Sequence, residues 1–282
     1  MLRSVSPLRV LDDRDLSEAR ALLAREPVLN VMVASRIETS GLDPWRLGAE
    51  VWGWFAGSRL ESLCYAGANF VPVSATPEAV RGFAERARRQ GRRCSSIVGD
   101  AWTVAALWEL LEPAWGSARE VRPRQPVLVA SEPPASVEPD PGVRLVRPDE
   151  LDLLLPAAVS MFTEEVGVSP TTGDGGELYR ARVAELIAHG RSYARIEDGR
   201  VIFKAEIGSV TTHACQVQGV WVDPELRGQG LGVQGMAAVL HLALRDIAPV
   251  VSLYVNDFNL AAREVYRQVG FTEAGTFMSV LF

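Results

Sequence analysis

The sequence predicts an α+β protein with a mixed α/β sheet, built from two halves of similar layout. Its 282 residues are about twice the usual size of one domain, and 48% of them are hydrophobic. Six of the 17 prolines lie between Pro123 and Pro141, and residues 131–142 carry almost no large apolar side chain. Such a segment is typical of a linker. We therefore expect a domain over residues 1–130, a linker over 131–142 and a second domain over 143–282.

Strand-like and helix-like runs follow one another in a similar order in the two halves. The N-terminal half predicts a strand at 8–11, a helix after Asp15, an apolar helix, three strands near 50–73, a helix from Pro77, a strand at 94–98 and a helix begun by Asp100. The C-terminal half predicts a strand at 143–146, helices near 149–163 and 176–189, strands at 192–196, 201–207 and 216–222, a helix, a strand at 250–255, a helix and a strand at 276–281. Residues 201–207 alternate as in a strand. Tyr179, Val183, Leu186 and Ile187 have the spacing of an amphipathic helix.

Charge and composition exclude several function classes. The net charge is −6 and the sequence pI is about 5.3, which argues against a broad cationic surface for nucleic acid. Of the 29 basic residues, Lys204 is the single lysine. We interpret the arginine bias as the codon usage of a GC-rich genome.

Cysteine and histidine usage predicts neither a disulfide framework nor a metal site. The three cysteines are widely spaced without a C-x-x-C pair, and the three histidines form no H-x-x-x-H pattern. Charged residues interrupt the N-terminus before any signal-peptide core forms, and no uncharged run of 18 apolar residues exists. We expect a soluble cytoplasmic protein without a membrane partner.

The clearest chemistry follows the strand that ends at Val222. After a turn through Asp223 and Pro224, glycines alternate at positions 228, 230 and 232 beside Arg227, and a helix follows. Glycines let successive N–H groups point into one concavity at the positive end of a helix, which predicts an anion-binding loop. The alternative is a tight turn without a ligand.

A dinucleotide fingerprint is a further interpretation of this loop. Gly230, Gly232 and Gly235 spell G-x-G-x-x-G, and Asp257 follows about 20 residues on. In that motif the first glycine closely follows the strand, whereas seven residues separate Val222 from Gly230 here. The remaining chain is also too short for a doubly wound domain, so the fit is poor.

Two motifs resemble those of the GCN5-related N-acetyltransferases (GNATs). The Val-x-Pro-x-x-Arg/Gln-Gly-x-Gly-x-Gly/Ala motif corresponds to Val222, Asp223, Pro224, Glu225, Leu226, Arg227, Gly228, Gln229, Gly230, Leu231 and Gly232. The second motif corresponds to Asn259, Ala262, Tyr266, Gly270 and Phe271. The resemblance covers residues 143–282 and implies a GNAT fold. The N-terminal half resembles the domain that precedes an acetyltransferase domain in some bacterial proteins, and tandem GNAT-like halves, the first degenerate, are expected. There Val98, Gly99 and Asp100 enter a helix without a glycine-rich loop.

The resemblance implies that acetyl-CoA binds as cosubstrate in a V-shaped split between the strands that end at Val222 and Val255. It assigns the backbone of Val220, Trp221 and Val222 to the pantetheine arm and thioester carbonyl, and the amides of Arg227–Gly232 to the pyrophosphate. Asn259 would bind the pantetheine and Tyr266 would be the general acid. Two helical turns separate these two residues, so they face one side, and a phenol there can protonate a thiolate. The alternative for Tyr266 is a place in the core.

The candidates for the acceptor side are charged residues. An amine with a pKa of about 10.4 is protonated at neutral pH, so a base or a desolvating pocket is needed. Glu206, on one strand face with Lys204, and Glu164, beside Glu165, are the candidate bases or acceptor ligands. The alternatives are a solvated strand pair and a charge run at a helix end.

Two further observations concern the candidate chemistry. Gln216 and Gln218 stand where many relatives have a Glu, so the simplest assignment of a base fails. Cys215 lies two residues from His213, and on one strand the two would share a face, which suggests a covalent route through an acetyl-cysteine. The alternative is that Cys215 is an inert, buried thiol.

The function expected from the sequence is acetyl-CoA-dependent acetyl transfer to a primary amine of a small molecule or protein, by direct attack in a ternary complex. The alternative is a non-catalytic acetyl-CoA-binding or interaction module, and an NAD-dependent oxidoreductase ranks third. Neither the acceptor nor the oligomeric state follows from the sequence.

Overall fold

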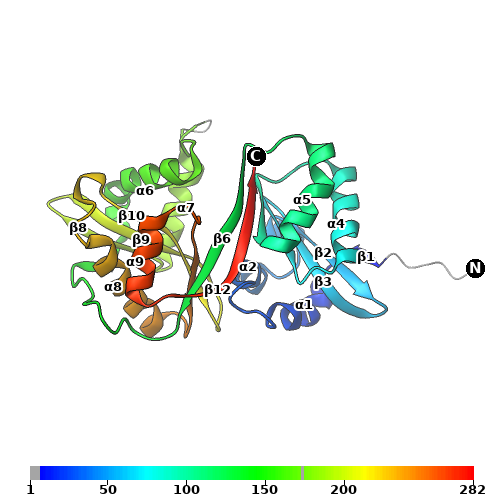
Figure 1. The fold of residues 1–282 in the computed structure, drawn as a ribbon, viewed down its shortest axis with the longest axis horizontal. Helices are drawn as coiled ribbons and strands as arrows, with labels where there is room; N and C mark the ends of the chain where they lie inside the picture. Colours follow the sequence, from blue (N-terminus) through cyan, green and yellow to red (C-terminus); the bar gives the residue numbers. More distant parts are fainter. Residues whose placement is uncertain (1–6, 173–174) are drawn as a thin grey trace, which may run out of the picture. The chain divides into compact units, whose positions relative to one another are not determined.

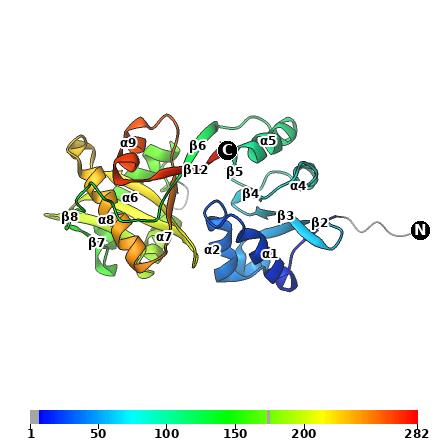
Figure 2. The ribbon, with the colours of Figure 1, turned by 60° about the horizontal axis from the view of Figure 1, so that its bottom comes forward.

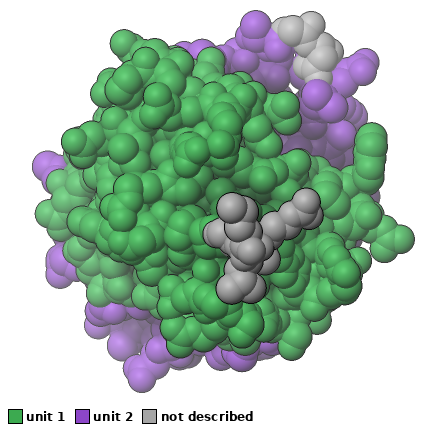
Figure 3. Space-filling model, turned by 90° about the vertical axis from the view of Figure 1, so that its right-hand side faces the viewer, with its two compact units in different colours: residues 1–127, 254–258, 273–282 green, residues 128–253, 259–272 purple. Residues whose placement is uncertain are grey.

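The computed structural model describes residues 7–172 and 175–282, and the chain divides into two compact units (Figure 3). Unit 1 comprises residues 1–127, 254–258 and 273–282, and unit 2 comprises residues 128–253 and 259–272. Within the described residues, no helix combines the length and the apolar character needed to cross a membrane.

Unit 1 is a mixed sheet with helices on both faces (Figure 1). Its strands, in sheet order, are β1 (Leu8–Val10), β2 (Glu50–Ala56), β3 (Arg59–Ala66), β4 (Asn69–Val73), β5 (Ser96–Asp100) and β12 (Thr272–Leu281). Neighbours are antiparallel except the parallel pair β4 and β5. Its helices are α1 (Leu16–Leu23), α2 (Val31–Ser40), α3 (Pro44–Leu47), α4 (Pro77–Gln90) and α5 (Ala101–Trp115). Side chains of α1 and α2 pack with Val51, Leu63 and Tyr65, and those of α4 and α5 pack with Trp52 and Cys64 on the other face.

Unit 2 repeats this layout (Figures 1 and 2). Its strands, in sheet order, are β7 (Val143–Leu145), β8 (Ser192–Glu197), β9 (Arg200–Val210), β10 (Cys215–Val222) and β11 (Val251–Tyr254). Only the last pair is parallel. Its helices are α6 (Leu151–Val166), α7 (Glu177–Ala188), α8 (Leu231–Asp246) and α9 (Leu260–Val269). The predicted α+β class with a mixed sheet is confirmed.

The two faces of the unit 2 sheet are set by alternation along β9. A Cβ on Gly235 would lie 2.7 Å from the Phe203 ring, so α8 packs closely on that face and needs a glycine there. The adjacent Lys204 points to the opposite face, where Met161 of α6 also lies. Both faces of β9 are therefore covered.

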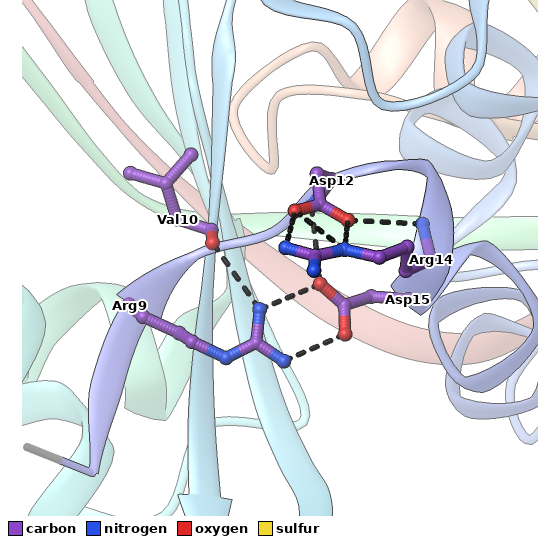
Figure 4. A network of polar contacts seen from close by, with 5 residues as sticks. All are labelled: Arg9, Val10, Asp12, Arg14 and Asp15. Atoms are coloured by element: carbon purple, nitrogen blue, oxygen red, sulfur yellow. Dashed lines mark hydrogen bonds and ion pairs between the residues drawn. The ribbon is translucent and has the colours of Figure 1, made fainter. Parts of the chain in front are cut away.

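One capping arrangement opens both units. In unit 1 the Arg9 guanidinium donates to both Asp15 carboxylate oxygens at 2.6 Å and to the carbonyl of the next residue at 3.3 Å (Figure 4). In unit 2 Arg144 donates to Glu150 at 2.7 and 2.8 Å and to the next carbonyl at 3.1 Å. Each arginine is the middle residue of a three-residue strand, and each carboxylate lies six residues on. The same local geometry at matching places indicates a duplicated unit.

The C-terminal segment differs from the expected domain division, and one strand was not predicted. The last strand, β12, pairs with β5, so the C-terminal segment belongs to unit 1 instead of the expected domain 143–282. Strand β6 (Glu120–Ala130) was not predicted from the sequence. Pro126 has no N–H to donate, but its carbonyl accepts a hydrogen bond from Val255 N at 3.2 Å. As expected, Val98, Gly99 and Asp100 lead directly into α5 without a glycine-rich loop. Since β4 and β5 are the parallel pair of unit 1, the counterpart of the glycine loop is the connection that follows β4.

Candidate active site

Two parallel strands of unit 2, β10 and β11, separate after a short ladder. β10 and β11 pair only at Cys215 with Val251 and at Gln216 with Ser252, and the Ser252 hydroxyl donates to the Cys215 carbonyl at 2.9 Å. β10 then continues to Val222 without a further partner on β11 among the described residues. The strands therefore leave a split above this short ladder.

The glycine loop lies between the free end of β10 and helix α8. Gly228 and Gly230 have φ of +79° and +84°, and a Cβ on either would meet nothing within 4 Å. These glycines are thus required by backbone conformation, not by crowding. Within the described chain, the backbone N–H groups of residues 228–232 have no acceptor, and the first turn of α8 holds no acidic side chain. This is the arrangement that binds an anion at a helix N-terminus.

An ion-pair cluster supports the loop from the strand side. The Arg200 guanidinium binds both oxygens of Asp223 and reaches Glu225 at 2.6 Å. Asp223 in turn accepts from the Glu225 N–H at 3.1 Å. The hydrogen bonds from Arg200 lower the pKa of Asp223 despite its desolvation. The sequence analysis did not identify Arg200, because it lies far from the loop in the chain.

Tyr266 is buried on α9, with 6% of its surface exposed. Its ring contacts Phe271 edge-on at 5.9 Å, and its hydroxyl has no hydrogen-bond partner among the described residues. Burial, and to a smaller degree the Glu165 carboxylate, raises the pKa of this phenol. The group is therefore held protonated and is able to donate. Asn259 caps the same helix by accepting from Ala262 N at 3.1 Å, which leaves its amide NH₂ group as a donor.

The helix that bears Tyr266 reaches the loop through apolar side chains. A Cβ on Gly232 would lie 3.5 Å from both Val222 and Val265. The end of β10, the start of α8 and α9 thus meet at this glycine. The structure therefore brings α9, the helix that bears Tyr266, against the glycine loop through Val265.

Lys204 and Glu206 form a buried ion pair, so the alternative of a solvated strand pair is wrong. The Lys204 side chain is 0% exposed and that of Glu206 is 6% exposed, with Nζ and Oε1 2.6 Å apart. Nζ also donates to the Gly219 carbonyl at 3.0 Å. Alternation alone indicated a strand here, but it did not show that both faces are covered.

Glu164 is bound by two donors. The Trp221 indole N–H donates to Oε1 at 3.1 Å, and Arg227 donates to Oε2 at 2.7 Å. Arg227 also donates to the Val222 carbonyl at 3.1 Å. Glu164 thus links α6 to β10 and to the glycine loop.

The covalent route through Cys215 finds no support in the geometry. The thiol is fully buried, and burial raises its pKa to about 12. His213 lies in the turn between β9 and β10 rather than on a strand with Cys215, so the expected shared face is wrong. The described residues also contain no group of three or more His, Cys, Asp or Glu side chains that could hold a metal ion.

Comparison with known sequences agrees with this geometry. Residues 162–271 match the acetyltransferase (GNAT) family. This part of the chain is similar in sequence to that family. Residues 49–154 match a family described as a domain of unknown function, DUF4081. The GNAT segment contains the split, the glycine loop and Tyr266.

Solved structures show the same fold over nearly the whole chain. A Drosophila protein is 14% identical with a TM-score of 0.68, and the match covers 99% of each chain. A GCN5-related N-acetyltransferase from Sphaerobacter thermophilus is 17% identical with a TM-score of 0.63, covering 96% of this chain and 93% of the other. A tandem GNAT protein from the clavulanic acid biosynthesis pathway is 16% identical with a TM-score of 0.57, covering 97% and 98%. The GNAT fold with tandem halves is therefore confirmed.

Unit 1 lacks the glycine loop of the GNAT segment. Its β4 and α4 are joined by residues 74–76, whereas residues 223–230 join β10 and α8. The start of α4 is capped by Thr76, whose hydroxyl accepts from Ala79 N at 3.2 Å. A Cβ on Gly99 would also lie 3.4 Å from the Pro72 carbonyl oxygen, so β4 and β5 stay close beyond their paired positions, Asn69 with Ser96 and Phe70 with Ile97.

Proposed function

We infer that the protein is an acetyl-CoA-dependent N-acetyltransferase whose acceptor is a primary amine of a small molecule or protein. The observation that carries this inference is the glycine loop, whose amides lack acceptors within the described chain, at the start of α8. A pyrophosphate is the anion that such a cradle suits. Arg227, 49% exposed beside the loop, adds a positive charge. The pantetheine arm would follow the backbone of residues 220–222, with Asn259 as a further donor.

The proposed reaction is direct attack in a ternary complex. The neutral amine nitrogen bonds to the thioester carbonyl carbon, the C–S bond breaks, and the sulfur takes the Tyr266 hydroxyl proton. The tyrosinate then recovers a proton from solvent, and the amide nitrogen releases its extra proton to a base or to water. Burial raises the pKa of the Tyr266 phenol, so the hydroxyl keeps its proton at neutral pH, but the same shift makes it a weaker acid toward the thiolate.

Two carboxylates remain the candidates for the base or for an acceptor ligand. Glu206 is bonded to Lys204 at one oxygen, and Glu164 is bonded at both oxygens. Each would need to exchange a partner to accept a proton from the amine. Because both carboxylates are already hydrogen-bonded, this observation favours the second candidate function, a non-catalytic acetyl-CoA-binding module.

Calorimetric titration with acetyl-CoA and with NAD tests the proposal. We expect acetyl-CoA to bind, Arg227→Ala to weaken it and NAD to give no heat. Release of free thiol in the presence of amines, lost in Tyr266→Phe, would separate the enzyme from the binding module. Absence of acetyl-CoA binding would overturn both.

A further inference from the structure

A bulge in β10 lies directly beside the buried ion pair. From Gln218 to Trp221 the strand advances three residues, while its β9 partners advance only two, from Glu206 to Lys204. Gly219 occupies the bulge with φ of +60°, a left-handed conformation that favours glycine. A Cβ there would also lie 3.2 Å from both Lys204 Nζ and Glu206 Oε2. The bulge and the ion pair are thus packed as one piece.

Lys204 fixes the orientation of one peptide group in this bulge. Its ammonium donates to the Gly219 carbonyl at 3.0 Å. Among the described residues all peptide bonds are trans, so the N–H of Val220, in the same peptide group, points the opposite way. Neither Gly219 nor Val220 has a Cα partner on β9 or β11. The Val220 N–H is therefore turned away from Lys204, on the part of β10 that lines the split.

The residue type is informative here. Arginine supplies every other basic side chain of the sequence, yet Lys204 is a lysine. A compact ammonium directs rotatable donors to a carboxylate and a carbonyl in a small buried space, which a planar guanidinium does not do. A buried ion pair also contributes little net stability, because desolvation offsets its attraction. Stability alone therefore does not account for it.

We propose that Lys204, held by Glu206, is a positioning residue that aims the Val220 N–H at the thioester carbonyl oxygen of acetyl-CoA. This inference rests on the proposed function. A fixed N–H at that oxygen stabilises the negative charge that develops during attack, and fixing it in advance avoids reorganisation in the transition state. Glu206 acts here as the partner that orients the ammonium.

Infrared spectroscopy of bound [1-¹³C]acetyl-CoA tests this role. The carbonyl stretch should lie at lower frequency on the wild-type protein than in solution, because the N–H bond weakens the C=O bond. The double variant Lys204→Met/Glu206→Gln removes the ammonium without leaving a buried carboxylate unpaired. We expect it to lose about half of the frequency displacement or more, with CoA affinity within about threefold of wild type. Glu150→Gln, which breaks the Arg144 pair outside the site, should keep the full displacement.

If the double variant does not fold, NMR spectroscopy of the wild-type protein tests the same proposal. Labelling with ¹⁵N-lysine gives one Nζ resonance, because the chain has one lysine. Acetyl-CoA should shift it more than CoA does, since a bond at the Val220 N–H polarises the peptide group that accepts from Lys204. Equal shifts, or an unchanged carbonyl frequency in the double variant, would overturn this inference alone. Failure of acetyl-CoA to bind would overturn the proposed function as well.

Discussion

Replacing Gly230 by alanine isolates the backbone contribution of the glycine loop. Gly230 has φ of +84° and open space where a Cβ would be, so the substitution introduces no clash. An L-residue in the left-handed region costs about 1–2 kcal/mol. The cost must reduce the sum of two free energies, that of folding and that of acetyl-CoA binding. It can fall on either of them.

The division depends on what the free loop does. If the alanine in Gly230→Ala were to keep the left-handed conformation, stability would fall and the melting temperature would drop by about 2–4 °C per kcal/mol. If the free loop relaxed, stability would be kept and acetyl-CoA affinity would fall by about 5-fold to 30-fold. Thermal unfolding and calorimetric titration of one variant measure both terms, whose sum should be about 1–2 kcal/mol.

Gly190→Ala is the matched control. Gly190 has φ of +64° and only Leu145, at 4.0 Å, near its Cβ position, and it lies after α7 instead of in the loop. It should lose similar stability with unchanged acetyl-CoA affinity. The reasoning would be refuted by a sum for Gly230→Ala below about 0.5 kcal/mol, or by an equal loss of affinity in Gly190→Ala.

Three further substitutions have distinct expected outcomes. Tyr266→Phe should keep stability within about 1 kcal/mol, because the hydroxyl has no partner to lose among the described residues, while thiol release with an amine acceptor falls about 100-fold or more; a large loss of stability would favour a core role. Glu164→Gln should tighten acetyl-CoA binding by up to about fivefold in calorimetry, because Arg227 no longer has a competing carboxylate; weaker binding would contradict this. Hydrogen bonds from Arg144 lower the pKa of Glu150 from 4.5 to about 2. This carboxylate therefore stabilises the fold above pH 4.5 and loses its contribution as pH falls toward 2, and Glu150→Gln should flatten that part of the stability profile by about 1 kcal/mol in denaturant titrations.

The sequence predicted the elements whose side chains obey one period. The amphipathic spacing around Val183 and the alternation over residues 201–207 each correspond to an observed element, α7 and β9. Strand β6 was missed because Pro123 and Pro126 are typical of linkers, although their carbonyls remain able to accept hydrogen bonds. Pairing of β12 with β5 could not be predicted, since strand partners distant in sequence are not encoded in local periodicity.

The candidate site divides in the same way. The loop could be predicted because its chemistry is local, with alternating glycines before a helix, and Tyr266 was named from its place in the second GNAT-like motif, two helical turns after Asn259. The hydrogen bonds of Glu164 and of Lys204 could not be predicted, because each joins residues of separate elements. The one local signal was the occurrence of a single lysine in an arginine-rich chain.

Corresponding positions in the two units predict one acetyl-CoA per chain. Asp100 caps α5 by accepting from Thr103 N at 2.9 Å, as Asn259 caps α9. Seven residues after each cap stand Leu107, fully buried, and Tyr266. Unit 1 thus has the same capped helix, but it has an aliphatic side chain in place of the phenol. It also has a helix capped by the Thr76 hydroxyl in place of the glycine loop. Calorimetry should give a stoichiometry of one, abolished by changes to the loop of unit 2, and a second site that survives those changes would show that unit 1 binds acetyl-CoA by other groups.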